Sequence, residues 1–271
     1  MKKLLALLAI SLTFIAPTVW AGTYFFSNTN AITINDHTSA TPYPSGISVS
    51  GIPLNEKIDK ITVTFHNLSH TFPGDIDMLL VAPSGTNLIL FSDAGNNLEI
   101  SGVTVTLDDD ALTSLPSTNV IVSGVFKPTN YGAAIDPFPA PAPAPSMATN
   151  LSIFKGTNPN GIWNLFVVDD ATIDTGSIAG GWSLTIRTAA LYTNSTWITI
   201  EDYIAPFESL PIQAFPYPSS IVVSNLTGNV VKVTATLNGF GRTSAGFADF
   251  FPEWVRVLLV SPAGTNLVLM S

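Results

Sequence analysis

The sequence predicts an all-β protein, built as a sandwich of short strands. Its apolar stretches are short, and Pro, Gly or Asn interrupts them about every ten residues, which is the spacing of strands and turns. The 271 residues include 19 Gly and 20 Pro, and only 11% of the residues are charged. Beyond the N-terminal segment, no stretch shows a sustained 3.6-residue period with helix caps, so we expect almost no helix.

Residues 1–21 have the features of a signal peptide. Lys2 and Lys3 form a positive start, residues 4–15 are mainly apolar, and small residues precede the expected cleavage after Ala21. The alternative is an uncleaved membrane anchor, but a proline interrupts the stretch before it reaches the ~20 residues of a span. We therefore expect a bacterial exported protein, in the extracellular space, at the cell surface or in the periplasm, without membrane insertion after cleavage.

The cysteine count limits how the fold can be stabilised, and the net charge limits which partners the protein can bind. The sequence has no cysteine, so disulfides cannot hold the fold and the core must do so. Cleavage would remove Lys2 and Lys3 and leave eight basic against 19 acidic residues, a net charge of −11. Such a surface would repel nucleic acid and anionic lipid, and it suits solubility or divalent cations.

The first strands follow from the alternation of side chains. Residues 61–65 alternate apolar and polar, as in a half-buried strand, and residues 78–81 are continuously apolar, as in a strand covered on both faces. The turn residues Pro83 to Thr86 follow, with Gly85 suited to a left-handed backbone position. The return strand begins at Leu88, so this stretch is predicted to form a β-hairpin.

Later strands follow the same rules. Residues 103–107 alternate again, and the acidic run after them ends the strand. Two further strands open with Trp163 and Trp182 and continue with apolar residues at every second position. These Trp side chains could stack on sugars, but their period-two neighbours favour the core. The Pro/Ala tract 136–145 is predicted to be an extended, solvated loop within one domain.

The sequence contains an internal repeat. Residues 78–92, MLLVAPSGTNLILFS, return as VLLVSPAGTNLVLMS in residues 257–271, and the PYPS of 42–45 returns in 216–219. We predict a complete sandwich over 22–188, a linker over 189–191 and a truncated second copy over 192–271. Nothing in the second copy corresponds to residues 93–187. Its open sheet edges should make it mobile, oligomeric or able to borrow strands from another copy.

Residues 24–188 contain the segments GDIDMLLVAPSGT, FKG, NGIWNL, DD, DTG and WSL, in this order. The order and spacing of these segments give a resemblance to the P domain (P/Homo B domain) of kexin/furin-type proprotein convertases, in its bacterial exported versions. It implies a jelly roll of about eight strands, here followed by a partial second sandwich. The family's P domain has no catalytic residues and supports a neighbouring subtilisin-like protease domain. The matching structural motif residues are Gly74, Asp75, Pro83, Gly85, Thr86, Gly161, Trp163, Gly176 and Trp182.

Clustered acidic residues are candidate metal ligands. Ca²⁺ takes six to eight oxygens, commonly from Asp carboxylates and loop carbonyls, and some bacterial P domains are understood to bind calcium. The alternative is that these residues solvate turns at strand ends, or, for Asp75, bond the backbone of the turn after Gly74. The candidates are Asp169, Asp170 and Asp174, then Asp108 and Asp110, then Asp75 and Asp77.

Three functions are compatible with these features. No protease domain precedes the sandwich and no Ser/His/Asp triad can be argued, so we expect a non-catalytic module for attachment, stabilisation or binding. The second hypothesis is an accessory portion of a secreted subtilisin-like serine endopeptidase, with a protease domain or other domains of a longer chain as partners. The third is a calcium-dependent carbohydrate-binding module, which shares the jelly-roll shape.

Overall fold

The computed structural model describes residues 7–11, 19–132, 136–190, 192–201, 213–224, 233–239 and 255–270. The chain forms two compact units, one of 17–191 with 224–234 and the other of 1–16, 192–223 and 235–271. The described residues are nearly all β, and their helical elements are two short 3₁₀ turns. No helix within these ranges is long and apolar enough to cross a membrane.

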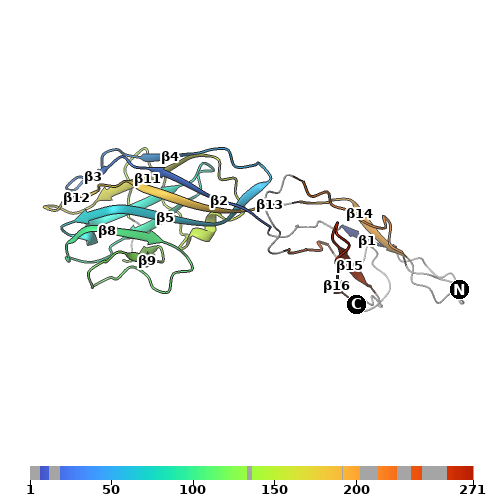
Figure 1. The fold of residues 1–271 in the computed structure, drawn as a ribbon. Coiled ribbons are helices and arrows are strands. Elements are labelled where there is room, and N and C mark those ends of the chain that lie inside the picture. Colours follow the sequence, from blue (N-terminus) through green and yellow to red (C-terminus); the bar gives the residue numbers. More distant parts are fainter. Residues whose placement is uncertain are drawn as a thin grey trace, which may run out of the picture. The chain divides into compact units, whose positions relative to one another are not determined.

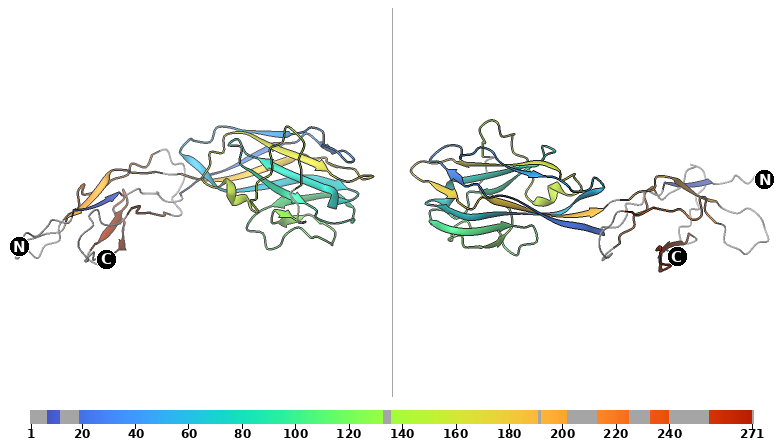
Figure 2. Two further views of the ribbon diagram at one scale, coloured as in Figure 1. Left: turned by 180° about the vertical axis from the view of Figure 1, so that it is seen from behind. Right: turned by 45° about the horizontal axis from the view of Figure 1, so that its top comes forward.

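The larger unit is a sandwich of two sheets (Figure 1, Figure 2). One sheet has the strand order β10-β7-β6-β11-β4. The other has the order β2-β13-β5-β12-β3, with β8 on the other side of β5 and β9 beside β8. The bounds are β2 (Val19–Asn28), β3 (Ile32–Ile34), β4 (Ser45–Val49), β5 (Glu56–His70), η1 (Pro73–Asp75), β6 (Ile76–Val81), β7 (Asn87–Ser92), β8 (Ile100–Leu107), β9 (Gly124–Phe126), β10 (Thr129–Asn130), η2 (Leu151–Phe154), β11 (Gly161–Asp169), β12 (Gly176–Ile178) and β13 (Trp182–Ala190).

The order of the longer strands is that of a jelly roll. Within the described part of this unit, eight strands have five or more residues, namely β2, β4, β5, β6, β7, β8, β11 and β13. Numbered one to eight along the chain, they form one sheet in the order 1-8-3-6 and another in the order 2-7-4-5. The long strands pair antiparallel, and the first strand lies beside the last. This arrangement confirms the predicted all-β jelly roll.

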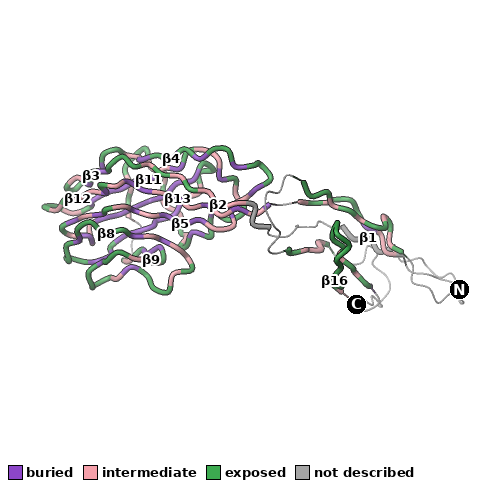
Figure 3. The backbone as a smooth tube through the Cα atoms, in the orientation of Figure 1, coloured by how far each residue is buried: buried purple, intermediate pink, exposed green. Residues whose placement is uncertain are grey.

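The core lies between the two sheets, where alternate residues of each strand are buried. β13 is buried at every second position and β5 follows nearly the same pattern, and Figure 3 shows the buried residues concentrated in the strands of the sandwich. Trp163 and Trp182 are fully buried, as predicted. Their indole N–H groups donate to Pro159 O at 2.9 Å and to Ser45 Oγ at 3.0 Å. Each therefore contributes apolar area without leaving a polar atom unpaired.

The β6–β7 hairpin is buried on both faces. Met78 and Leu80 belong to the core between the sheets, whereas Leu79 and Val81 face outward into a second apolar cluster. This outer cluster is covered by Tyr43, Phe138 and Ala142. The Pro/Ala tract 136–145 thus differs from the predicted solvated loop, because two of its apolar side chains cover the sheet.

The smaller unit contains two pairs of strands. β1 (Leu7–Ser11) pairs antiparallel with β14 (Trp197–Glu201), and β15 (Val257–Val260) forms a hairpin with β16 (Asn266–Met270). β1 therefore comes from the predicted signal peptide, of which residues 7–11 and 19–21 are described. The expected cleavage after Ala21 falls within β2, whose first residues pair with the end of β13.

Candidate metal centre

Three carboxylates converge at one end of the β6-containing sheet. Asp77 comes from β6, Asp170 directly follows β11, and Asp136 lies in the loop that follows β10. Each places one oxygen within 4.8 Å of an oxygen of both others. Like charges this close in a partly buried setting repel strongly, so the arrangement suits a cation or shared protons.

The antiparallel pairing of the strands explains this convergence. β6 runs opposite to both β7 and β11, so its first residues lie beside the last residues of its neighbours. Asp77 is directly opposite Val168 in the register. Asp93 follows the end of β7 and reaches the same edge, where it shares the Ser92 hydroxyl with Asp136. The cluster is therefore built from segments far apart in the sequence.

Asp77 is the buried member of the cluster. Its residue is only 3% exposed, and its Oδ2 has no hydrogen-bond partner among the described residues. Burial, together with the negative charges of Asp136, Asp170 and Asp93, raises its pKa to about 8. A buried carboxylate oxygen without a donor is costly unless it is protonated or bound by a cation.

The neighbouring acidic groups show the same electrostatic effect. Burial and the nearby carboxylates raise the pKa of Asp93 and the pKa of Asp170. Burial and the charges of four surrounding carboxylates, with Asp169 the first among them, raise the pKa of Asp75 to about 6. The whole edge of the sheet thus carries more negative charge than the described residues neutralise there.

A layer of hydrogen bonds holds the loop after β11 in place. Asp169 is buried and accepts hydrogen bonds from the backbone N–H groups of His37 and Ala171. His70 Nδ1 accepts from the Phe72 N–H at 3.2 Å, so the ring Nε2 carries the proton that bonds Asp169 Oδ2 at 3.1 Å. Asp169 is therefore engaged in positioning the loop, and Asp170 is left to face Asp77.

The predicted metal ligands do not come together in one site. Asp77 and Asp170 come together, whereas Asp174 accepts a hydrogen bond from Thr71 at 2.7 Å. Asp75 lies in η1, where its N–H donates to Phe72 O, and Asp170 N–H donates to Asp75 O. Asp108 and Asp110 bind Lys60 elsewhere on the sandwich, at 2.7 and 2.5 Å.

Asp136 and Asp93 also belong to this edge of the sheet, although neither was among the metal ligands predicted from the sequence. The position of Asp93 carried a usable signal, because an Asp directly after a buried strand lies at the same sheet edge as one that opens the antiparallel neighbour. Asp136 carried no such signal. Its position depends on the path of the Pro/Ala tract, which the packing of Phe138 and Ala142 on the sheet determines.

The family motif residues hold strands and turns together. Gly85 has φ +85° in the turn between β6 and β7, which also contains Pro83 and Thr86. Gly176 opens β12, and a Cβ there would lie 2.2 Å from Ser69 O, so only glycine permits this close pairing with β5. The remaining motif residues take up structural positions as well: Gly74 in η1, Gly161 at the start of β11 against Pro83, and Trp163 and Trp182 in the core.

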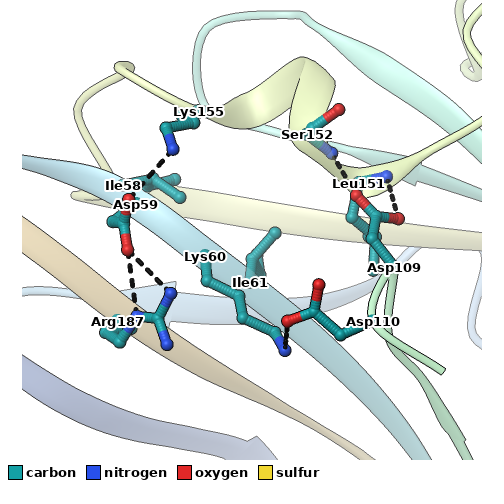
Figure 4. Close-up of a pocket in the computed structure, with 10 residues that line it drawn as sticks. All are labelled: Ile58, Asp59, Lys60, Ile61, Asp109, Asp110, Leu151, Ser152, Lys155 and Arg187. Carbon is teal, nitrogen blue, oxygen red and sulfur yellow. Dashed lines mark hydrogen bonds and ion pairs between the residues drawn. The ribbon is translucent and has the colours of Figure 1, made fainter.

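A second charged region lines a shallow hollow of about 280 Å³ beside β5 (Figure 4). Asp59 binds Arg187 through Nε at 3.0 Å and Nη2 at 2.8 Å, and Lys155 through Nζ at 3.0 Å. Asp109 accepts the N–H groups of Leu151 and Ser152, both at 2.8 Å, at the start of η2. The acidic and basic side chains that line this hollow neutralise one another. We therefore interpret them as a structural network of ion pairs.

Comparisons with known proteins give a distant structural likeness. No family model and no curated protein matches the sequence. Among solved structures, the serine protease of Aeromonas sobria in complex with its chaperone ORF2 is 15% identical, with a TM-score of 0.31. A second structure of that protease is 14% identical, with a TM-score of 0.30. Each match covers 70% of this chain and only 28% of the other.

Proposed function

We propose that the protein is a non-catalytic, calcium-binding jelly-roll module of an exported protein. The observation that carries the proposal is the unpartnered, buried Oδ2 of Asp77, which lies in a cluster with Asp136 and Asp170. Carboxylate oxygens are the ligands that Ca²⁺ prefers, and its flexible coordination tolerates carboxylates contributed by separate loops. Water and nearby backbone carbonyls would supply the remaining oxygens.

The chemistry of the cluster fits a hard divalent cation. Its members are all oxygen ligands, and the three named carboxylates bring up to three negative charges to one point. A cation there would offset both the repulsion and the cost of burial that raise the pKa of Asp77. Binding would stabilise the folded sandwich, since the unfolded chain does not hold these residues together.

Calcium binding is tested by isothermal titration calorimetry on chelator-treated protein. We expect one site per chain in the wild type and loss of that site in Asp136→Asn and in Asp170→Asn, because each substitution removes a charge from the cluster. Asp110→Asn is the matched control and should bind as the wild type does, since Asp110 lies on Lys60. A competing titration with Mg²⁺ distinguishes calcium from divalent cations in general.

Retained binding in both cluster variants, or no calcium heat in the wild type, would overturn the assignment. Loss of binding in Asp110→Asn alone would move the site to the end of β8. The folded state of each variant is checked by circular dichroism before titration.

An accessory role beside a subtilisin-like serine endopeptidase is the second candidate. It is supported by the motif resemblance to the convertase P domain, which implied a jelly roll of about eight strands; the sandwich has the strand order of a jelly roll. Such a module would stabilise a protease domain and would not itself hydrolyse peptides. A fluorogenic peptide assay with a serine-reactive probe tests this: labelling of the isolated chain would contradict a non-catalytic role.

A further inference from the structure

The repeated sequence forms the same hairpin twice. Leu79 pairs with Ile89 and Leu80 with Leu88 in β6–β7, and the corresponding Leu258–Val268 and Leu259–Leu267 pairs form in β15–β16. Both hairpins have a register shift after the first residue of the repeat, at Met78 and at Val257. The turns also agree: each closes with N–H···O bonds of 2.8 and 2.9 Å, and the turn glycines have φ +85° and +82°.

In the first copy, a further strand covers the edge of the hairpin that is not paired within it. β11 pairs antiparallel with the free edge of β6, placing Phe166 opposite Leu79 and Leu165 opposite Leu80. Trp163, Leu165 and Val167 of β11 enter the core, while Phe166 joins the outer cluster. With this strand in place, all residues of β6 and β7 are buried.

The second hairpin is exposed instead. Leu258 is 55% exposed and Leu267 is 61% exposed, although their counterparts in the first copy are buried. β15 and β16 form a sheet of two strands, and no other strand of the described chain pairs with β15. An uncharged apolar strand edge of this kind is a template for strand addition.

Another strand of the second copy pairs with a strand that is distant in the sequence. β14 corresponds to β3, since Thr199 exchanges two backbone bonds with Phe215 as Thr33 does with Thr41. Asn194 bonds Ser219 Oγ and Ser220 O, as Asn28 bonds Ser45 Oγ and Gly46 O. In the first copy β12 pairs with β3, and in the second copy β1 takes that place on β14.

We propose that the β15–β16 hairpin is a strand-acceptor site for an antiparallel peptide segment with the side-chain pattern of β11. The occupant is an extended, uncharged segment with large apolar residues at alternating positions, in the order Trp-x-Leu-x-Val. Backbone bonds to the edge of β15 would supply affinity, and the apolar contacts would supply specificity. The β11 strand of a second copy is not this occupant, because β4 and β6 already pair with both its edges.

The proposal is tested with a fluorescent peptide of residues 160–168, NGIWNLFVV, with lysines added outside this segment at both ends for solubility. Fluorescence anisotropy on the full chain should show saturable binding. A peptide of the same composition with the alternation broken should not bind, nor should the original peptide N-methylated at alternate amides, since methylation blocks one bonding edge. These peptide controls need no change in the protein.

Variants of the protein test whether the peptide binds at the edge of β15. Leu259→Lys should weaken peptide binding at least about tenfold, because Leu80, its counterpart, meets Leu165 of β11 in the core. Leu112→Lys is the control and should leave binding unchanged, since Leu112 is 98% exposed in the sandwich. Equal binding of all three peptides, or full binding by Leu259→Lys, would overturn the proposal.

Analytical ultracentrifugation of the same samples identifies the competing occupant. The proposal expects a monomer that binds one peptide. The proposal would be overturned by a dimer that Leu259→Lys dissociates and that the peptide does not compete with. Such a dimer would show that the edge of β15 pairs with a second copy of itself. Calcium titration is independent of this outcome, because the metal cluster lies on other strands.

Discussion

In the absence of divalent cations, the free energy of unfolding is expected to fall as the pH rises from about 4 to about 8. The pKa of Asp77 is raised to about 8 in the folded protein by burial and by neighbouring carboxylates, whereas an Asp in an unfolded chain titrates near ~3.9. Over this interval the folded state holds a proton that the unfolded state has lost. The resulting stabilisation is complete below pH ~4 and is lost as the pH rises through the folded pKa.

Asp75 contributes with the same sign over a narrower interval, because its pKa is raised to about 6. The measurement is urea unfolding of protein treated with a chelator, at several pH values between 4.5 and 8.5 (on the order of one pH unit apart). Saturating calcium should flatten the profile, since the cation replaces the proton on the cluster. Asp77→Asn should flatten it without calcium, and a chelated wild type that becomes more stable with rising pH would contradict the electrostatic account.

Replacement of Trp163 by Ala is expected to lower the free energy of unfolding of the sandwich by about 3–5 kcal/mol. Trp163 is fully buried and meets Phe154 edge-on, with ring centroids 5.1 Å apart. Its removal would leave a cavity between the sheets and would also leave Pro159 O without its indole donor. The buried indole ring of Trp163 therefore packs between the two sheets near the start of β11.

Phe25→Ala is the matched control, because Phe25 is an aromatic residue of β2 that is 76% exposed. A change within about 0.5 kcal/mol is expected there. Both variants are measured by urea unfolding followed by tryptophan fluorescence and circular dichroism. A cost below about 1 kcal/mol for Trp163→Ala would show that the core closes around the vacated space.

Local sequence patterns predicted the strands well, because the order of apolar and polar residues in a strand reflects which of its faces are buried. The alternation at residues 61–65 and the double burial at 78–81 are both present in the structure. The family resemblance, and not the alternation, predicted a jelly roll, because alternation does not say which strand is the neighbour. The pairing of β1 with β14 could not be predicted, because the composition of residues 7–11 is that of an export signal.

The metal cluster was predictable only in part. Asp77 and Asp170 stand out because carboxylates at strand ends are conspicuous in an apolar sequence. That they meet each other, and not Asp108 or Asp174, depends on the pairing of β6 with β11. Asp136 joins them only because a proline-rich loop covers the outer face of that sheet.

The wide separation of the three carboxylates along the chain bears on how the protein resists unfolding. A cation bound by Asp77, Asp136 and Asp170 would join three points of a chain without a single cysteine, with 58 and 33 residues between successive ligands. Its ligands meet only once β6 and β11 are paired, so the cross-link would form after that pairing. The bound ion would slow the opening of the sheet edge, as a disulfide does in secreted folds.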